Sequence, residues 1–485
     1  MFESRFSSHY TQNPLNFQQF MHRVTGGNIR EVLRVSIPLI LASTGHALSL
    51  FVDRAMLANY SQEAVSASFP AGLTSFTLDC FFFGVTSYTN VFVAQYYGAK
   101  NFKRVGTAVW QGIFIGLVGG LLLSTGYFWA KPLFASFGHD PKVQELEVIY
   151  FQILSLGAAF PLLTNALSAF WSGRGRTVII MFTNFLVTFL NILFNYLLIF
   201  GKTINLGRGY CISFPEMGIA GAAWGTVLSG GAGTLFLACI FFLSKINRKT
   251  YGSCEHVFDW SLLKRILYYG SPNGIQLFLD VAAFNVFAIL LGLISVPVQE
   301  AASIVFALNS LSFQPMIGLG QTASVLVGQA IGARNIKLAK QSIRSTRFLV
   351  ILYSCFMLFI FLVYPDNILS LFARKNDIAQ IEAMEYARKF LYFITAYILF
   401  DGIGVIYAAA IKGAGDTKFV MITHIVVAWG CFAIPSIIYK YLGGSVWGLW
   451  TISLFYIILL AIFFYLRYRG GAWKTMCIIE EQHKT

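Results

Sequence analysis

The chain has 485 residues, of which 56% are hydrophobic and 12% are charged, and its formal net charge is +14. Because a soluble domain carries about 25% charged residues, this composition excludes an ordinary soluble fold and indicates a protein surrounded by lipid. The positive charge could suggest a nucleic acid partner, but the placement of Lys and Arg along the chain argues against one.

Twelve apolar runs that are long enough to cross a membrane follow one another along the chain. They cover approximately residues 35–56, 67–97, 108–130, 147–171, 177–200, 218–244, 263–294, 300–331, 347–371, 389–411, 419–439 and 444–466. Each run is continuous, whereas the strands of a membrane barrel would appear as segments of about ten alternating residues. We therefore predict an all-α polytopic membrane protein with twelve transmembrane helices, of which the second, seventh and eighth extend beyond the bilayer.

The basic residues lie mainly on one side of these spans. If the N-terminus is cytoplasmic, most of the 35 Lys and Arg fall in the arm before the first span, in the loops after even-numbered spans and in the tail. This bias follows the positive-inside rule and predicts that both termini are cytoplasmic. Residues 1–34 are polar and hold no signal-peptide core, so we expect the first span to direct insertion.

Nearly the same nine residues occur twice. Residues 93–101 read VAQYYGAKN and residues 327–335 read VGQAIGARN, and further matches flank both copies in the same order. The repeat predicts two six-helix bundles in the same orientation, related by a pseudo-twofold axis along the membrane normal and enclosing a cleft that opens to alternate sides. The predicted segments are an N-terminal arm (1–30), a first bundle (31–245), a linker (246–262), a second bundle (263–467) and a tail (468–485).

The repeated motif lies at the expected cytoplasmic ends of the second and eighth spans. Gln95 and Gln329 can satisfy carbonyl groups near a helix end, and Gly98 and Gly332 suit a helix C-cap. We therefore interpret the motif as one that shapes a turn rather than one that binds substrate.

Two carboxylates near the middle of spans need an explanation, because an ionisable group in hydrocarbon costs at least about 2.5–3.5 kcal/mol. Asp280 lies in the seventh span and Asp401 in the tenth, and the matching positions of the first bundle hold no acid. Tyr397 lies one turn before Asp401, on the same helical face. Two carboxylates and a phenol can supply oxygen ligands to a hard cation such as Na⁺, or share a proton. These three residues are our predicted cation-binding and coupling site, with plain interhelical hydrogen bonding as the alternative.

The chain resembles the multidrug and toxic compound extrusion (MATE) transporters. The resemblance covers nearly all of residues 30–470 and rests on the doubled QxxGAxN motif, KGAGDTK at 412–418, FVDRAMLA at 51–58 and YILFD at 397–401. It implies a twelve-helix export fold in two lobes, driven by inward flow of Na⁺ or H⁺. In the NorM-like branch, a Glu of span seven and the Tyr and Asp of a YxxxD stretch form the cation site. The matching residues here are Asp280, Tyr397 and Asp401, so that Asp replaces Glu.

The resemblance also implies a secondary cation or substrate site in the first bundle. Asp53 matches the family's span-one acid, which in the archaeal branch works with an Asn and an Asp four residues apart in span five and with a Thr in span six. The matching residues are Asn191, Asn195 and Thr226, and Asn195 replaces the Asp. Arg54 is adjacent to Asp53 and could neutralise part of its charge, and polar helix packing is the alternative reading of this set.

Asp79, in the outer half of the second span, has no role that the resemblance assigns. It could contact substrate in the cleft, or it could be the partner of a polar residue on a neighbouring helix. Aromatic residues form 16% of the chain, and Phe-rich patches would suit flat lipophilic cations, although most Phe side chains are expected to face lipid.

Together with the resemblance, these features predict a secondary antiporter, and the NorM-like resemblance implies that its membrane is a bacterial inner membrane. It would export amphiphilic, often cationic organic compounds in exchange for Na⁺ or H⁺, as a monomer in membrane lipid, without a cofactor or a nucleic acid partner. A flippase for lipids or lipid-linked glycans and a dedicated exporter of one metabolite or siderophore are the alternatives; twelve spans and acidic membrane residues count against the flippase. A channel is disfavoured because no selectivity-filter sequence occurs, and an enzyme because no HExxH, GxSxG or P-loop motif occurs.

Overall fold

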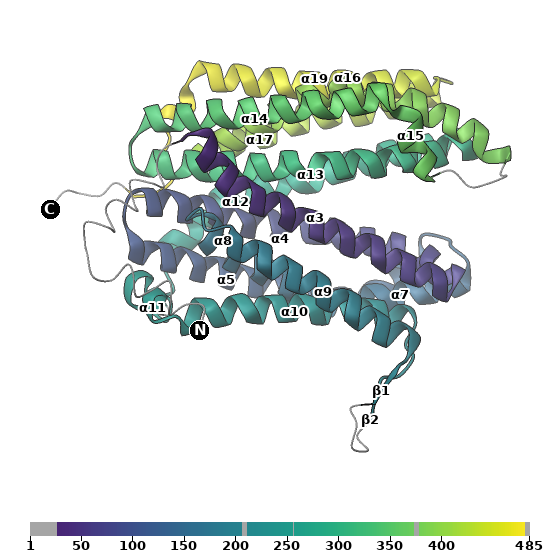
Figure 1. Ribbon diagram of the computed structural model, residues 1–485, viewed down its shortest axis with the longest axis horizontal. Coiled ribbons are helices and arrows are strands. Elements are labelled where there is room, and N and C mark those ends of the chain that lie inside the picture. The colour runs from purple at the N-terminus through teal and green to yellow at the C-terminus, as the bar shows by residue number, and fades with distance from the viewer. Residues whose placement is uncertain (1–26, 206–210, 256, 373–377, 481–485) are drawn as a thin grey trace.

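The computed structural model describes residues 27–205, 211–255, 257–372 and 378–480. Long helices run side by side along its longest axis (Figure 1). The predicted N-terminal arm lies outside the described residues as far as residue 26, and so do the last five residues of the predicted tail.

The first half of the chain is helical apart from one short antiparallel hairpin. Its elements are α3 (Ile29–Tyr60), α4 (Gln62–Gly98), α5 (Phe102–Ser124), α6 (Gly126–Ala135), α7 (Pro141–Gly157), α8 (Ala159–Ser172), α9 (Val178–Phe200), β1 (Thr203–Asn205), β2 (Cys211–Ser213), α10 (Ile219–Leu243) and α11 (Lys245–Tyr251). The hairpin projects beyond the helices at the end where α7 begins (Figure 1).

The second half repeats this plan. Its elements are α12 (Trp260–Gly292), α13 (Val296–Gly332), α14 (Ile336–Val363), α15 (Pro365–Leu369), η1 (Ser370–Phe372), α16 (Ile378–Ala414), α17 (Thr417–His424), the π-helical η2 (Ile425–Ala433), α18 (Ile434–Tyr441), α19 (Val446–Gly470) and η3 (Ala472–Lys474). The helices of each half group together, with the second half above the first in Figure 1.

Twelve single helices or runs of two or three consecutive helices correspond to the twelve predicted spans. Within the described ranges, eleven are long and apolar enough to cross a membrane. The twelfth, α4, is 37 residues long but more polar, and its stretch from Val91 to Tyr97 is buried on every side. A helix enclosed by other helices exposes little surface to lipid, so it tolerates polar side chains. The predicted all-α fold is confirmed.

Some helices differ in extent from the apolar runs. The third predicted span divides at Thr125 into α5 and α6, and the fourth divides at Ala158 into α7 and α8. Conversely, α16 begins at Ile378, about eleven residues before its apolar run. Hydropathy marks the part of a helix that suits lipid, whereas backbone hydrogen bonding continues into the polar turns beyond it.

The two halves meet along α3 and α4 on one side and α12 and α13 on the other. Glycines permit the closest approach, because a Cβ at Gly84 would lie 2.9 Å from the backbone nitrogen of Gly274. Asn273 on α12 then donates to the Gly84 carbonyl at 2.7 Å, which ties the two helices together near the middle of the protein.

The doubled motif forms the same turn in each half. After Gly98 the chain turns at Lys100, whose φ is +60°, and after Gly332 it turns at Arg334, whose φ is +54°. The interpretation as a turn is therefore confirmed, but the C-caps are Ala99 and Ala333, so the prediction that the glycines cap these helices is wrong. The Asn that ends each motif instead caps the following helix, as Asn335 does by accepting from the Leu338 N–H at 3.1 Å.

The two glycines serve the contact between the lobes. A Cβ at Gly98 would lie 2.7 Å from the carbonyl carbon of Gln329, and a Cβ at Gly332 would lie 2.7 Å from that of Gln95. Because backbone atoms cannot give way as a flexible side chain can, any larger residue at either position would push the lobes apart.

The two motif glutamines cross from one lobe to the other. Gln95 Nε2 donates to the Gly413 carbonyl at 3.0 Å, and Gln329 Nε2 donates to the Gly173 carbonyl at 2.7 Å. Each acceptor lies at the end of the fourth span of the opposite half, Gly413 in the last turn of α16 and Gly173 at the C-cap of α8. We call Gln95 and Gln329 the crossed glutamines; with the glycines they join the two lobes at this end.

The last described residues cover the same end. Ile478 is 1% exposed, and its N–H donates to Gln95 Oε1 at 3.0 Å. The Glu480 carboxylate pairs with Arg265 on α12 at 2.6 Å and with Arg104 on α5 at 3.5 Å. The segment therefore joins the two halves, a role that its short polar sequence did not predict.

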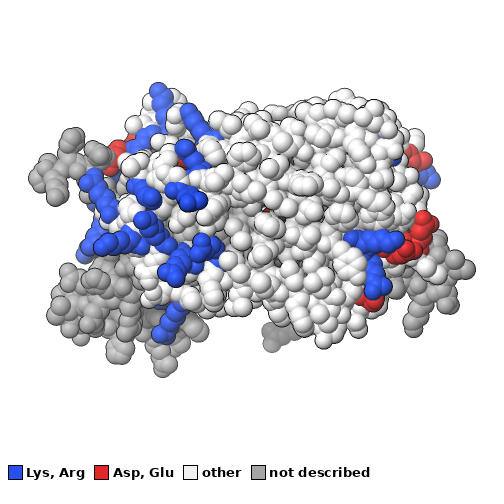
Figure 2. Space-filling view, turned by 90° about the horizontal axis from the view of Figure 1, so that it is seen from above, with Lys and Arg blue, Asp and Glu red and all other residues white. Residues whose placement is uncertain are grey.

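Lys and Arg gather at the end of the molecule that holds the doubled turns, whereas both signs of charge meet at the opposite end (Figure 2). The residues of these turns and of the helices that follow them include Lys100, Lys103, Arg104, Arg334, Lys337 and Lys340. We call this the basic end.

Candidate functional site

The predicted acid of the seventh span lies beside a histidine. Asp280 lies on α12, and its Oδ1 is 2.7 Å from Nδ1 of His424, the last residue of α17. These two atoms are close but not aligned as a hydrogen bond, so each remains a buried polar atom without a hydrogen-bond partner in the described structure. The other carboxylate oxygen accepts from Gln276 Nε2 at 3.2 Å.

Lys412 determines how this network is oriented. Its ammonium group can only donate, and it lies 3.3 Å from Gln276 Oε1 and 3.2 Å from Asn273 Oδ1. Gln276 must therefore present its NH₂ group to Asp280 and to His424 Nε2, which is 3.2 Å away. A ring nitrogen that accepts leaves the proton of neutral His424 on Nδ1, on the side of Asp280.

Asp401 and Tyr397 lie on α16 in the same lobe. Tyr397 is 4% exposed within the core of that lobe. The charge of Asp280 acts on Asp401, that of Asp401 acts on Tyr397, and both carboxylates act on Tyr456 of α19. The three predicted residues thus lie within electrostatic range, but none of the hydrogen bonds between described residues joins Asp280 directly to Asp401 or Tyr397.

His424 is the residue of this cluster that the sequence reasoning missed. It stands in the eleventh span, where an ionisable side chain needs a reason just as the acids do. A search for every ionisable residue within the spans, rather than mainly for acids, would have found it. Its pairing with Asp280, 144 positions away, depends on the packing of α12 against α17.

If Asp280 binds the coupling cation, as the sequence predicts, His424→Ala should strengthen that binding. Loss of the ring removes the atom that lies 2.7 Å from Asp280 Oδ1, so a proton or Na⁺ no longer competes with it for the carboxylate. The cation concentration for half-maximal efflux should fall about tenfold, which corresponds to roughly 1.4 kcal/mol. Initial efflux rates from proteoliposomes over a range of Na⁺ concentrations and of pH measure this. His139→Ala, which removes a half-exposed His paired with Glu147 at 2.7 Å, is the control; an unchanged or raised half-maximal concentration for His424→Ala contradicts the expectation.

The structure brings the predicted residues of the first bundle together. Asp53 on α3 is 8% exposed and accepts a hydrogen bond from Asn195 of α9. Asn191 Nδ2 donates to the Thr226 hydroxyl of α10 at 3.4 Å. The Oδ1 atoms of both Asn191 and Asn195 are buried, and neither has a hydrogen-bond partner in the described structure. A carboxylate with two such carbonyl oxygens beside it has the chemistry to bind a hard cation, and this role stays a prediction.

Arg54 points away from this cluster. Its guanidinium carbon lies 5.1 Å from the centre of the Phe69 ring, in cation–π geometry. No ion pair between described residues joins it to Asp53, but its charge still acts on that carboxylate, so partial neutralisation by Arg54 stays a prediction.

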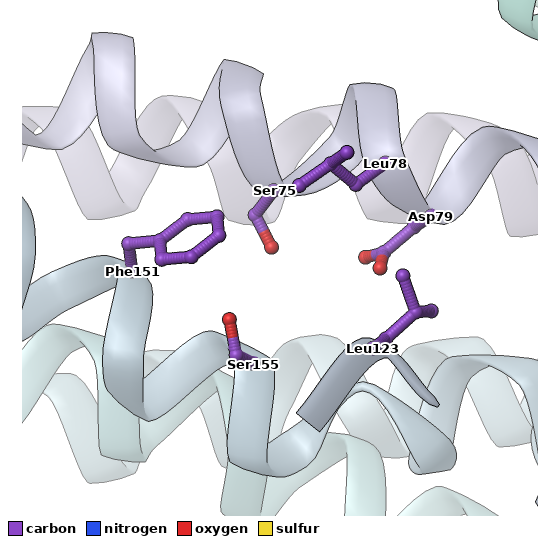
Figure 3. Close-up of a pocket in the computed structure, with 6 residues that line it drawn as sticks. All are labelled: Ser75, Leu78, Asp79, Leu123, Phe151 and Ser155. Atoms are coloured by element: carbon purple, nitrogen blue, oxygen red, sulfur yellow. The ribbon is translucent and has the colours of Figure 1, made fainter. Parts of the chain in front are cut away.

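Asp79 lies inside the first lobe. It lines a small cavity between α4, α5 and α7, all of which belong to the first half (Figure 3). Contact with a substrate stays a prediction.

A family model shows to which protein family the chain with these two clusters belongs. The model of the MatE family matches residues 38–197 and 272–438, which is most of both halves and includes Asp53, Asp280 and Asp401. The chain belongs to the MatE family. The MatE family is one of membrane transporters, so this MatE protein is an integral, multi-pass membrane protein.

Relatives along nearly the full length agree with this assignment. A probable multidrug resistance protein NorM of Thermotoga maritima is 24% identical over 455 residues, which cover 93% of this chain and 95% of that protein. A protein of the same name from Rhizobium meliloti is 26% identical over 411 residues, 83% of this chain and 84% of its own. The predicted resemblance to NorM-like MATE transporters is confirmed.

Solved structures share the fold. A MOP superfamily transporter from Pyrococcus furiosus superimposes with a TM-score of 0.80 at 21% identity, covering 93% of this MatE protein and 98% of that chain. An outward-facing multidrug resistance MATE family transporter gives a TM-score of 0.80 at 19% identity, covering 94% and 98%. At such identities the likeness shows the fold, and the predicted pair of six-helix bundles is confirmed.

Proposed function

We propose that this MatE protein is a secondary antiporter that exports amphiphilic, often cationic organic compounds in exchange for Na⁺ or H⁺. The observation that carries the proposal is the pair of acids, Asp280 and Asp401, within electrostatic range of each other inside one lobe. Two partly buried carboxylates that repel each other inside one lobe favour uptake of a cation or a proton. The names of the NorM relatives support multidrug compounds as the exported class.

The network around Asp280 supports a coupling role. Cation uptake at Asp280, with Tyr397 and Asp401 as further oxygen donors, would compete with the His424 contact. Release of His424 would in turn free Gln276 and Lys412, and Lys412 bonds Asn273, which holds α12 against α4. Cation binding in the second lobe is thereby linked to the interface between the lobes. A ligand shifts a conformational equilibrium only if it binds the two states differently, and these rearranging contacts would supply that difference.

The basic end is, in this proposal, the cytoplasmic side of a bacterial inner membrane. The positive-inside rule supports this orientation, with both termini inside. The crossed glutamines and the segment around Ile478 then form the inward gate in its closed state. The protein is proposed to act as a monomer whose partners are its substrate and membrane lipid, without a cofactor besides the coupling ion and without nucleic acid.

Transport by reconstituted protein tests the proposal. With the purified full chain in proteoliposomes, efflux of a fluorescent lipophilic cation is followed while a Na⁺ gradient and a pH gradient are imposed separately. We expect either the Na⁺ gradient or the pH gradient, directed toward the cytoplasmic side of the protein, to raise the initial efflux rate at least about tenfold over the rate without a gradient. The other of these two gradients should have little effect on the rate. A rate that neither gradient changes contradicts antiport. Transfer of a labelled lipid-linked glycan without any export of organic cations would favour the flippase instead.

A further inference from the structure

The cavity beside Asp79 is built from polar groups that converge. It has a volume of about 10 Å³ and is lined by Ser75, Leu78, Asp79, Leu123, Phe151 and Ser155. In Figure 3 the hydroxyl groups of Ser75 on α4 and Ser155 on α7 point toward each other across the cavity, and the Asp79 carboxylate points into it. The space is about that of one water-sized sphere.

The hydroxyl groups of Ser75 and Ser155 do not form the hydrogen bonds to backbone carbonyls that neighbouring hydroxyl side chains form. On the same helix, the Thr74 hydroxyl donates to the Pro70 carbonyl and the Thr77 hydroxyl to the Leu73 carbonyl, each at 2.8 Å. Buried Ser and Thr side chains in helices commonly bond back in this way. Ser75 is 7% exposed and Ser155 is 4% exposed, yet neither hydroxyl makes a hydrogen bond to any described residue.

Asp79 also lacks a positive partner. Among the residues that the structure describes, none forms an ion pair or hydrogen bond with its carboxylate, and Asp79 is partly buried. A carboxylate without a partner in a membrane-spanning helix is unfavourable, so it needs a cation, a proton or a polar partner. A water molecule alone would satisfy the hydroxyls but would leave the charge of Asp79 in place.

We propose that Asp79, Ser75 and Ser155 form a binding site for one Na⁺ ion within the first lobe. One carboxylate balances one positive charge, and hydroxyl and carboxylate oxygens are the ligands that hard cations take. A divalent ion is disfavoured, because no group of three or more His, Cys, Asp or Glu in the described ranges could hold a metal. The site is separate from the Asp53 cluster, which α3, α9 and α10 build, and from the Asp280 cluster of the other lobe. It goes beyond the proposed antiport, since its occupancy does not depend on which ion drives transport.

The site also has a structural consequence. Its ligands come from α4 and from α7, so bound Na⁺ would hold these two helices together in the outer part of the first lobe. α4 also carries the crossed glutamine Gln95, close to its C-terminal end. Na⁺ would therefore stabilise the first lobe, and this effect can be measured without transport.

Binding of radioactive Na⁺ to the purified full chain tests the proposal. The measurement uses a background with Asp53→Asn, Asp280→Asn and Asp401→Asn, so that the other predicted cation sites are removed. We expect this background to bind about one Na⁺ per chain, displaced by unlabelled Na⁺ but not by choline, and Na⁺ to raise its melting temperature relative to choline. Addition of Asp79→Asn should abolish both effects. Addition of Ser155→Ala should weaken binding about tenfold, because one ligand to a charged group is lost.

Ser68→Ala is the matched control. Ser68 is a buried serine of the same helix, but its hydroxyl bonds back to the Val65 carbonyl at 2.9 Å, so its loss should leave Na⁺ binding unchanged. If Asp79→Asn does not fold, Ser155→Ala decides. The proposal is overturned if the background binds no Na⁺, or if binding persists unchanged in Asp79→Asn or in Ser155→Ala. Because all transport-coupling acids are already neutralised, failure of this site and failure of the proposed antiport give different results.

Discussion

Replacing Asp280 by Asn is expected to lower ion-coupled efflux by about a hundredfold or more. The amide keeps the shape of the side chain but can neither take up a proton nor balance Na⁺. It also leaves His424 and Gln276 facing a neutral group. A hundredfold loss of cation binding corresponds to about 2.8 kcal/mol, which the loss of the one charged ligand at this position is expected to reach. Efflux of a fluorescent cation from proteoliposomes, driven by whichever gradient drives the wild type, is the measurement.

Two further variants make the result specific. Glu385→Gln removes an exposed carboxylate from α16, the helix that also carries Asp401. The Glu385 side chain is 68% exposed and pairs with Lys389 at 2.6 Å. It should transport at the normal rate, because surface ion pairs contribute little. Asp280→Glu restores the charge and should recover part of the activity. Normal dye extrusion by Asp280→Asn under an imposed gradient would falsify the assignment of Asp280 to coupling.

Replacing Gly98 or Gly332 by Ala is expected to open the basic end. The new methyl group would overlap the backbone of Gln329 or of Gln95 in the opposite lobe, and neither can move without moving its helix. Overpacking of this kind costs about 1–3 kcal/mol. If the cost applies only when the two lobes are in contact, the closed state of this gate loses about 5- to 150-fold in population relative to the open state.

Spin labels across the gate report this shift. Lys103 on α5 and Lys337 on α14 are exposed at the basic end of opposite halves, and both can be replaced by Cys in a background without the seven native Cys. The distance distribution in each glycine variant should move toward longer distances, and coupled efflux should fall about tenfold or more. Gly470→Ala, at the same end, is the control, because a Cβ there meets no atom within 4 Å. A wild-type distribution in both Gly98→Ala and Gly332→Ala would mean that the contact is not part of the gate.

The two predicted clusters show which contacts between site residues can be predicted from their spacing in the sequence and which cannot. Asn191 and Asn195 lie four positions apart on a helix, so they share a face wherever that helix packs. Their meeting with Asp53 and Thr226 was inferred from the resemblance to known transporters, and the structure places all four together. For Asp280 the outcome differs. Its span and its isolation in the apolar run could be predicted, but its contact with His424 could not, because it depends on how α12 lies against α17.

In the doubled motif, too, some features could be predicted from the sequence and others depend on the tertiary structure. That Gln95 and Gln329 play matching roles follows from the repeat alone, and that the motif turns the chain follows from its glycine. Which residue is left-handed, and why glycine is required, could not be inferred, because the nearest atoms to Gly98 belong to Gln329 in the other half.

The amino-acid sequence by itself determined that this MatE protein is surrounded by lipid, that it is built of membrane-spanning helices and that it consists of two related halves. Each depends on short-range properties, namely the length of apolar runs, the spacing of like residues and the recurrence of a motif. Only the tertiary structure decided which buried polar groups meet: His424 with Asp280, the crossed glutamines with the opposite lobe, and two serines with Asp79. The physical reason is that an unsatisfied polar group in an apolar interior specifies that it needs a partner, whereas the identity of that partner depends on helix crossings between residues far apart in the chain.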